Sequence, residues 1–180
     1  CYLDYFLDRV SKNICMIDKL LEKSIHESSK DNEVAVLLSG GVDSISVAFA
    51  AHRLGKKVSG YTFHIEGNPS YDSEKAIEIC DVMNWKCVDT EVPIDNLRGD
   101  FFTLLKEIKC VKKTHFECCF PFLYVYPNIK EYEVLTGLGA DGYYGVSKKA
   151  CIHFKTPKEK FDEYRNEHYL PENLGGKIWH

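Results

Sequence analysis

Two kinds of hydrophobic pattern follow one another along the chain, one typical of helices and one typical of buried strands. Near the start, apolar side chains recur every three to four residues, which predicts an amphipathic helix. Short unbroken apolar runs such as 34–38 favour strands that are buried on both faces of a parallel sheet. Strands are expected at 34–38, 58–64, 86–92 and 133–136. Helices are expected at 2–28, 73–84 (with Ser73 as N-cap), 95–109 and 119–130, and another opens at Thr156-Pro157. A further helical pattern runs through Val47, Ala48, Ala51 and Leu54 and stops near Gly55.

This alternation predicts an α/β fold, a doubly wound and mainly parallel sheet of about four to five strands with helices on both faces. Right-handed crossovers carry the first three strands outward, and the long excursion over 95–130 returns the fourth strand beside the first. Strand order then reverses between strands one and four, where ligands bind beyond the carboxyl ends. We expect three parts: an N-terminal amphipathic helix (1–30), an α/β domain that contains the sheet (31–150), and a C-terminal helical extension (151–180) that can be truncated.

Composition limits the classes of function. With 180 residues, 44% hydrophobic and 28% charged, the chain suits one globular domain. A net charge of −4 argues against duplex nucleic acid as a partner. The sequence has no apolar run long enough to span a membrane, its first residues do not resemble a signal peptide, and its eight cysteines form no Cys-x-x-Cys pair. We expect reduced thiols and a cytoplasmic protein.

The segment Ser-Gly-Gly-Val-Asp-Ser after the first strand predicts a phosphate-binding loop. Gly40 and Gly41 let backbone N–H groups approach an anion, and the following helix start adds partial positive charge. Ser39 and Ser44 can add hydroxyl donors, and Asp43 offers a carboxylate to Mg²⁺. The plainer interpretation is a tight turn in which Ser44 caps a helix. The segment is neither a Walker loop nor a dinucleotide-binding fingerprint.

This segment resembles the signature of the PP-loop (N-type) ATP pyrophosphatases, which include asparagine, β-lactam, GMP and NAD synthetases and tRNA thiolation enzymes. Two further loops bring the resemblance closest to the synthetase domain of asparagine and β-lactam synthetases. Residues 67–72 resemble that domain's Gly-Ser-Pro-Asp loop, and 135–145 resemble its Ser-Gly-Glu-Gly-Ala-Asp-Glu-Leu-Phe-Gly-Gly loop. Residues 120–124 resemble the segment that opens the helix before the fourth strand. The resemblance covers about residues 34–149.

The resemblance implies ATP and Mg²⁺ as cofactors and assigns roles to matching positions. Adenine and ribose would lie against Leu37, Phe63 and Gly137, with Gly139 in the same loop. Pyrophosphate would be held by Ser39, Gly40, Gly41 and Ser44. Mg²⁺ would be held by Asp43 and Asp141, since two carboxylates facing a polyphosphate need a bridging cation. The catalytic candidates are Asp43, Ser44, Asp141 and Lys148; Lys148 could reach the α-phosphate or be a solvated basic side chain.

The chain also departs from the family pattern. The glutamate between the two glycines of the second loop is Leu138 here, and the glutamate after Asp141 is Gly142. Leucine cannot transfer a proton, so we do not expect ordinary asparagine synthesis. His64, at the end of the second strand, could touch ribose or substrate, or be an incidental polar residue.

Three functions remain open. The first is an adenylating ligase that activates a carboxylate with ATP, releases pyrophosphate and transfers a nitrogen nucleophile from a glutaminase partner, free ammonia or an amine. The second is a tRNA- or nucleobase-modifying adenylating enzyme, which Cys118, Cys119 and His115 would favour as a sulfur site unless they only pack in a core. The third is a module that binds nucleotide without turnover.

Overall fold

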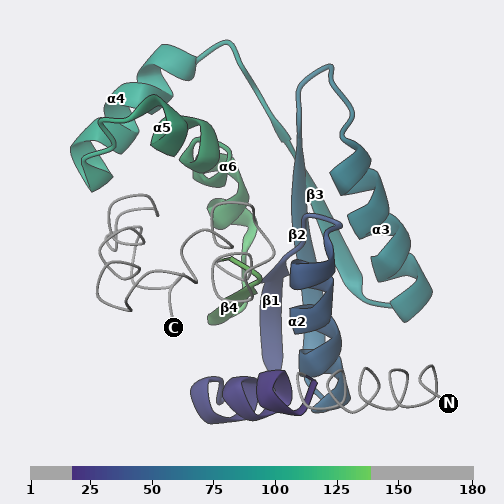
Figure 1. The fold of residues 1–180 in the computed structure, drawn as a ribbon. Helices are drawn as coiled ribbons and strands as arrows, with labels where there is room; N and C mark the ends of the chain where they lie inside the picture. Colours follow the sequence, from purple (N-terminus) through teal and green to yellow (C-terminus); the bar gives the residue numbers. More distant parts are fainter. Residues whose placement is uncertain (1–17, 139–180) are drawn as a thin grey trace, which may run out of the picture.

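A four-stranded parallel sheet forms the centre of the computed structural model, which describes residues 18–138. Its strands are β1 (Glu33–Leu37), β2 (Lys57–Ile65), β3 (Lys86–Val92) and β4 (Glu133–Thr136). They lie in the order β3-β2-β1-β4, and each neighbouring pair is parallel (Figure 1). The predicted α/β class is confirmed, and so is the reversal of strand order between β1 and β4.

Helices cover both faces of this sheet (Figure 1). The helices after β1 are α2 (Val42–Arg53), α3 (Tyr71–Met83), α4 (Leu97–Ile108), α5 (Lys113–Cys119) and α6 (Phe122–Val125), which a 3₁₀ turn (Tyr126–Asn128) extends. A further helix covers residues 18–28 before β1; the remainder of the helix expected from residue 2 lies outside the described residues. No helix of the described part of the chain is long and apolar enough to cross a membrane. The expected division into three parts stays a prediction.

Successive residues of β1 point to opposite faces and fill two separate cores, as the period of a strand requires. Val34 and Val36 pack with α2, α3 and Ile25 of the first helix. Ala35 and Leu37 pack on the other face with Val125 of α6. Because both faces are covered, β1 is apolar throughout its middle, and this is why its sequence is an unbroken hydrophobic run.

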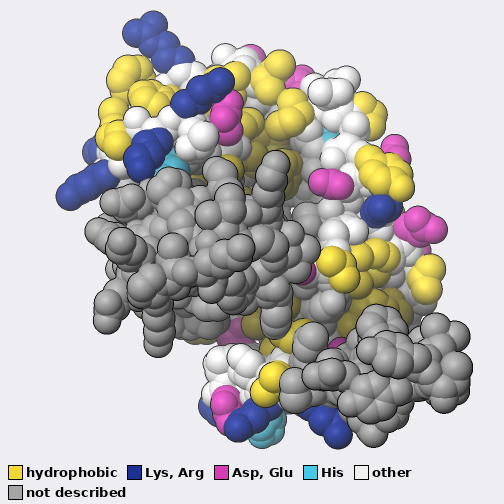
Figure 2. All heavy atoms as spheres, viewed as in Figure 1, with side chains coloured by type: hydrophobic (Ala, Val, Ile, Leu, Met, Phe, Trp, Pro, Cys, Tyr) yellow, Lys and Arg dark blue, Asp and Glu magenta, His cyan; other side chains and the backbone are white. Residues whose placement is uncertain are grey.

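The region between β3 and β4 differs from the prediction. The expected helix at 119–130 is wrong in its bounds. Helix α5 begins at Lys113 and ends at Cys119, and after an interruption the short helix α6 follows. Pro121, between the two helices, has no backbone N–H to continue the hydrogen bonds of α5. Helices α4 and α5 form a separate small core that includes Leu104. Figure 2 shows hydrophobic and basic side chains together at the surface in this region, where Phe102 is 55% exposed.

The start of α3 also differs. Ser73 is not its N-cap, because the helix already begins at Tyr71 after Ser70. The Ser73 hydroxyl donates a hydrogen bond to the Ser70 carbonyl 2.8 Å away, inside the first turn. Helix α3 therefore starts closer to the carboxyl end of β2 than the sequence indicated, and its first residues reach the cavity described next.

Candidate functional site

A cavity of about 430 Å³ lies at the carboxyl ends of β1, β2 and β4, where strand order reverses. Its size is that of small-molecule sites, which are typically several hundred Å³. It is lined by Leu37, Leu38, Ser39, Asp43, Ser44, Tyr61, Thr62, Phe63, Ser70, Asp72, Phe122, Val125, Thr136, Gly137 and Leu138. The first strand–helix junction and the end of β4 both reach it, as the topology predicted.

Hydroxyl and amide groups shape the junction between β1 and α2. The Ser39 N–H donates to Ser44 Oγ over 3.2 Å, and the two serine hydroxyl oxygens are 3.3 Å apart. The Ser44 hydroxyl donates to the Gly41 carbonyl at 3.1 Å. The first amides of α2 have no acceptor within the helix, as at any helix start. Together with the helix dipole they make a place where an anion is stabilised.

Two glycines bring backbones into direct contact beside this junction. Gly40 has φ +68°, and a Cβ there would lie 2.8 Å from both the Asp72 carbonyl oxygen and Lys75 Cβ. A Cβ on Gly137 would lie 2.6 Å from the Ser44 nitrogen and 2.7 Å from the Asp43 carbonyl carbon. The end of β4 therefore rests on the first turn of α2, and the first turn of α3 rests on Gly40.

Aromatic and aliphatic side chains form the opposite wall. The rings of Phe63 and Phe122 meet edge to face with centroids 5.9 Å apart, and Leu37 packs in the same cluster. Tyr61 donates a hydrogen bond from its hydroxyl to Glu131 at 2.6 Å. Burial, together with this hydrogen bond, raises the pKa of Tyr61 to about 12, so its ring carries no charge at neutral pH. This wall suits a flat, weakly polar ring.

Among the described residues, the charged side chains that line the cavity are two carboxylates, Asp43 and Asp72. Asp43, half-buried, lies in the first turn of α2, and Asp72, exposed, lies in the first turn of α3. No Lys, Arg or His side chain of residues 18–138 lines the cavity. Two carboxylates beside an anion-stabilising helix start are the setting in which a divalent cation binds together with phosphate oxygens. Leu138, 46% exposed, also borders this space, and its N–H donates to Thr136 Oγ1 at 3.2 Å.

The structure brings most of the predicted residues together. Those that line the cavity are Leu37, Ser39, Asp43, Ser44, Phe63 and Gly137, while Gly40 and Gly41 lie in the same junction. Gly139, Asp141 and Lys148 lie outside the described residues. His64 is not among the lining residues; its ring instead contacts Asp89 and Glu91 of β3. Cys118, Cys119 and His115 belong to α5 and do not line the cavity either.

Sequence reasoning missed several lining residues. The missed residues are Leu38, Tyr61, Thr62, Ser70, Asp72, Phe122, Val125 and Thr136. A signal existed for Ser70 and Asp72, which lie in the stretch after the second strand that resembles a family loop. Phe122 also had a signal, since it lies in residues 120–124, which resemble the family segment before the fourth strand. Thr62 and Tyr61 carried no such signal, because their place depends on how β2 pairs with β1.

Comparison with known proteins assigns the family. Residues 16–173 match the sequence model of the family described as asparagine synthase. The chain belongs to the asparagine synthase family. This confirms the predicted resemblance to PP-loop ATP pyrophosphatases, and proteins of these families use ATP, generally with Mg²⁺. A comparison with curated proteins gives no match.

Two solved structures share the fold. The NMN synthetase of Francisella tularensis is 18% identical with a TM-score of 0.50, over 75% of this chain and 57% of that one. The NH3-dependent NAD synthetase of Campylobacter jejuni subsp. jejuni, solved with a nitrate ion, is 17% identical with a TM-score of 0.50, over 88% of this chain and 74% of that one. The chain thus spans little more than half of the first structure. At these identities the likeness concerns the fold.

Proposed function

We propose that this chain is an ATP-dependent adenylating enzyme: it joins AMP to a substrate, most simply a carboxylate, and releases pyrophosphate before a nitrogen nucleophile displaces AMP. The observation that carries the proposal is the junction at 39–44, whose amides, hydroxyls and carboxylate open into a cavity with an apolar aromatic wall. Family membership supports the use of ATP.

The cavity residues fit a nucleotide and its metal. The close contacts of Gly40 and Gly137 with the starts of α3 and α2 hold the junction in place, and its glycine-rich backbone can offer N–H groups to a phosphate chain. The base and ribose would lie along Leu37, Phe63 and Gly137, next to the ring of Phe122. Asp43 offers one carboxylate to Mg²⁺, and we assign the second to Asp141. Bound Mg²⁺ would neutralise charge on the leaving pyrophosphate.

The chain's own groups act mainly by positioning. N–H groups at the start of α2 and the hydroxyls of Ser39 and Ser44 would hold the pyrophosphate oxygens while the α-phosphorus stays open to the acceptor oxygen. In that step the bond from acceptor oxygen to phosphorus forms and the bond to the pyrophosphate oxygen breaks. We place Lys148 near the α-phosphate and Gly139 beside the ribose, as the family resemblance implies.

The second half-reaction is where this chain should differ from asparagine synthesis. A nitrogen nucleophile must lose a proton, a transfer that a positioned base accelerates by about 10² to 10⁴. Leu138 provides no base at the cavity edge and instead desolvates it. We therefore propose an acceptor or amine that is bulkier or less polar than aspartate with ammonia.

The experiment is to measure pyrophosphate release on addition of ATP, Mg²⁺ and candidate carboxylates, and to measure asparagine formed from aspartate and ammonia. We expect ATP binding and pyrophosphate release with a suitable acceptor, and no appreciable asparagine. Efficient asparagine formation would show that the glutamate replaced by Leu138 is dispensable. Binding of ATP with no release for any carboxylate or nucleobase would make the chain a binding module, and a thiolated or aminated base would make it a nucleobase-modifying enzyme.

A further inference from the structure

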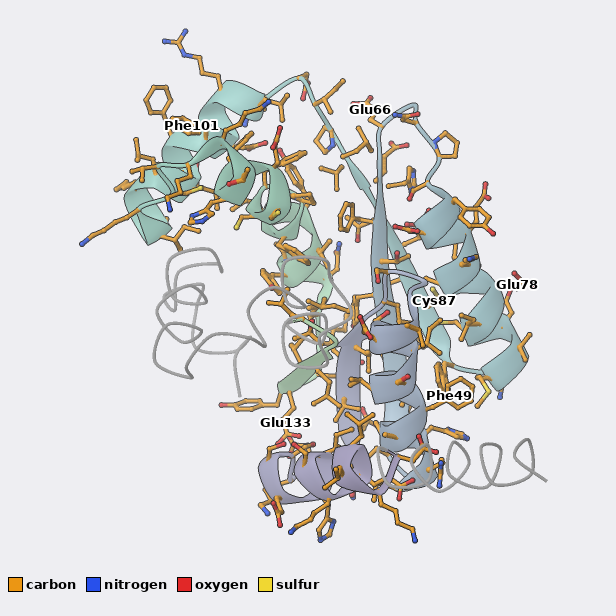
Figure 3. All side chains as sticks on the ribbon, viewed as in Figure 1. Phe49, Glu66, Glu78, Cys87, Phe101 and Glu133 are labelled. Carbon is orange, nitrogen blue, oxygen red and sulfur yellow. The ribbon has the colours of Figure 1, made fainter. Side chains whose placement is uncertain are left out.

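Two cysteines meet where the chain turns from α3 into β3. Asn84 ends α3 in the left-handed conformation, with φ 54°, and the Trp85 N–H donates to the Cys80 carbonyl at 2.8 Å. This turn reverses the chain within a few residues, so that Cys87, the second residue of β3, runs back alongside the last turns of α3. Figure 3 shows Cys87 on the side of β3 that α3 covers.

A glycine in the neighbouring strand makes room for the sulfur of Cys80. Gly60 of β2 is the direct partner of Cys87 in the sheet register. A Cβ on Gly60 would lie only 2.6 Å from Cys80 Sγ. The sulfur of Cys80 therefore rests on the backbone next to Cys87, and Cys87 packs against the same core cluster that contains Cys80. Both cysteines are free thiols.

The two thiols differ in access and in acidity. Cys80 is 0% exposed, whereas Cys87 is only half-buried and can meet a small solute. A hydrogen bond between the thiols lowers the pKa of Cys87, although burial opposes this. The same hydrogen bond and burial raise the pKa of Cys80. Because burial disfavours the charged form, the more exposed Cys87 is the thiol that more readily becomes a thiolate, the form that reacts with peroxides.

We propose that Cys80 and Cys87 form a reversible redox site whose oxidant is hydrogen peroxide or an organic hydroperoxide. The Cys87 thiolate attacks the peroxide, an S–O bond forms, the O–O bond breaks, and the first water (or alcohol) leaves. Cys80 then attacks the Cys87 sulfur, the S–S bond forms, the S–O bond breaks, and a water leaves. Both sulfurs are oxidised, and the peroxide is reduced. A small dithiol reverses the reaction by thiol–disulfide exchange.

The disulfide would fasten the end of α3 to β3. It closes a short loop across the turn, and such closure stabilises a folded chain mainly by restricting its unfolded state. For a chain of this size we expect the melting temperature to rise by about 5 °C on oxidation. The proposal does not rest on ATP use, since neither cysteine lines the cavity.

The sequence offers a direct assay. Trypsin cleaves after Lys75, Lys86 and Arg98, so Cys80 and Cys87 fall in separate peptides, 76–86 and 87–98. The intact folded chain is treated with hydrogen peroxide, remaining thiols are alkylated, and the digest is mapped by mass spectrometry. We expect these two peptides to be joined and to separate after reduction. If peroxide oxidises exposed Cys118 while both of these peptides carry alkylated thiols, the proposal is wrong.

Variants test the order of the steps. Cys80→Ser should leave Cys87 as a sulfenic acid that dimedone traps, whereas Cys87→Ser should leave Cys80 reduced and alkylated only after unfolding. Cys119→Ser is the matched control: it removes a buried thiol from the α4–α5 core and should leave the joined peptides unchanged. Equal trapping at Cys80 and Cys87 would contradict the assigned roles. Because the wild-type map carries the main test, a variant that fails to fold does not remove it.

Discussion

The turns after β1 and β2 contain glycines with the same backbone conformation and opposite surroundings. Gly40 and Gly67 both have φ +68°, a conformation that costs other residues about 1–2 kcal/mol. A Cβ on Gly67 would have nothing within 4 Å, whereas one on Gly40 would press on the Asp72 carbonyl and Lys75. The second turn needs glycine for its backbone alone. The first also needs it for packing, because the start of α3 rests on Gly40.

Alanine at each position separates these two requirements, and here we expect the largest effect. Gly67→Ala should lower the free energy of unfolding by about 1 kcal/mol, the cost of the left-handed conformation. Gly40→Ala adds overpacking against backbone, so we expect a loss of roughly 3 kcal/mol together with loss of ATP binding. Denaturant unfolding and nucleotide titration of both variants check this. Equal losses would mean that the contact between Gly40 and α3 is not tight in solution.

The acidic residues that follow the two turns allow a second comparison. Asp43 is half-buried at the start of α2, and Asp72 is exposed at the start of α3. We expect Asp43→Asn to reduce Mg²⁺-dependent pyrophosphate release by about 10² or more, the scale of losing a key electrostatic group. Asp72→Asn is the matched variant, and its effect should stay below about tenfold because an exposed carboxylate is well screened. A larger loss in Asp72→Asn would make Asp72 the primary metal ligand.

A double variant sharpens the assignment of Asp43. If Asp43 and Asp141 hold one ion, losing the second carboxylate costs little once the first is gone, so their effects on pyrophosphate release are non-additive. The double variant should then be no more than about tenfold slower than the slower single variant. Measuring the rate against Mg²⁺ concentration provides the check. Fully additive losses would contradict a shared ion.

The two turns also show how far the sequence predicts the fold. The strands β3 and β4 were predicted with their observed bounds, because Pro93 and Gly137, residues that commonly end a strand, follow them directly. The strand order followed from right-handed crossovers and one long excursion. The first turn was identified because its glycines, serines and aspartate follow a buried strand directly, so that its chemistry is local in sequence.

The parts of the fold and the site that were not predicted depend on contacts between residues that are distant in sequence. The second turn contributes Asp72 to the cavity only because α3 begins at Tyr71 and packs on Gly40, about thirty residues earlier in the chain. The α5 helix was missed because its short segment, Lys113–Cys119, lacks a clear apolar period and is held by a small core with α4. Phe122 reaches the cavity through its contact with Phe63, which no periodicity reveals.

The smallest expected effect concerns His64, near the second turn. Its Nδ1 lies 2.9 Å from Asp89 Oδ2 and its Nε2 lies 3.4 Å from Glu91 Oε2, both on β3. The hydrogen bond with Asp89, supported by the nearby charges, raises the pKa of His64 above its usual value. A raised pKa means that the folded state binds the proton more tightly than the unfolded state. The stabilisation is therefore complete below the unfolded pKa, about 6.5, and is lost as pH rises through the higher folded pKa.

We expect His64→Gln to lower the free energy of unfolding by about 0.5 kcal/mol near pH 6, the scale of a surface ion pair, and by almost nothing near pH 9. Asp89→Asn should remove most of the same pH dependence, with the remainder due to Glu91, while ATP affinity should not change in either variant, because His64 does not line the cavity. Denaturant unfolding across this pH range measures the difference. A difference that does not vary with pH would show that the ring stabilises β2 by packing alone. The region after β2 would then depend, like the junction after β1, on close packing and not on charge.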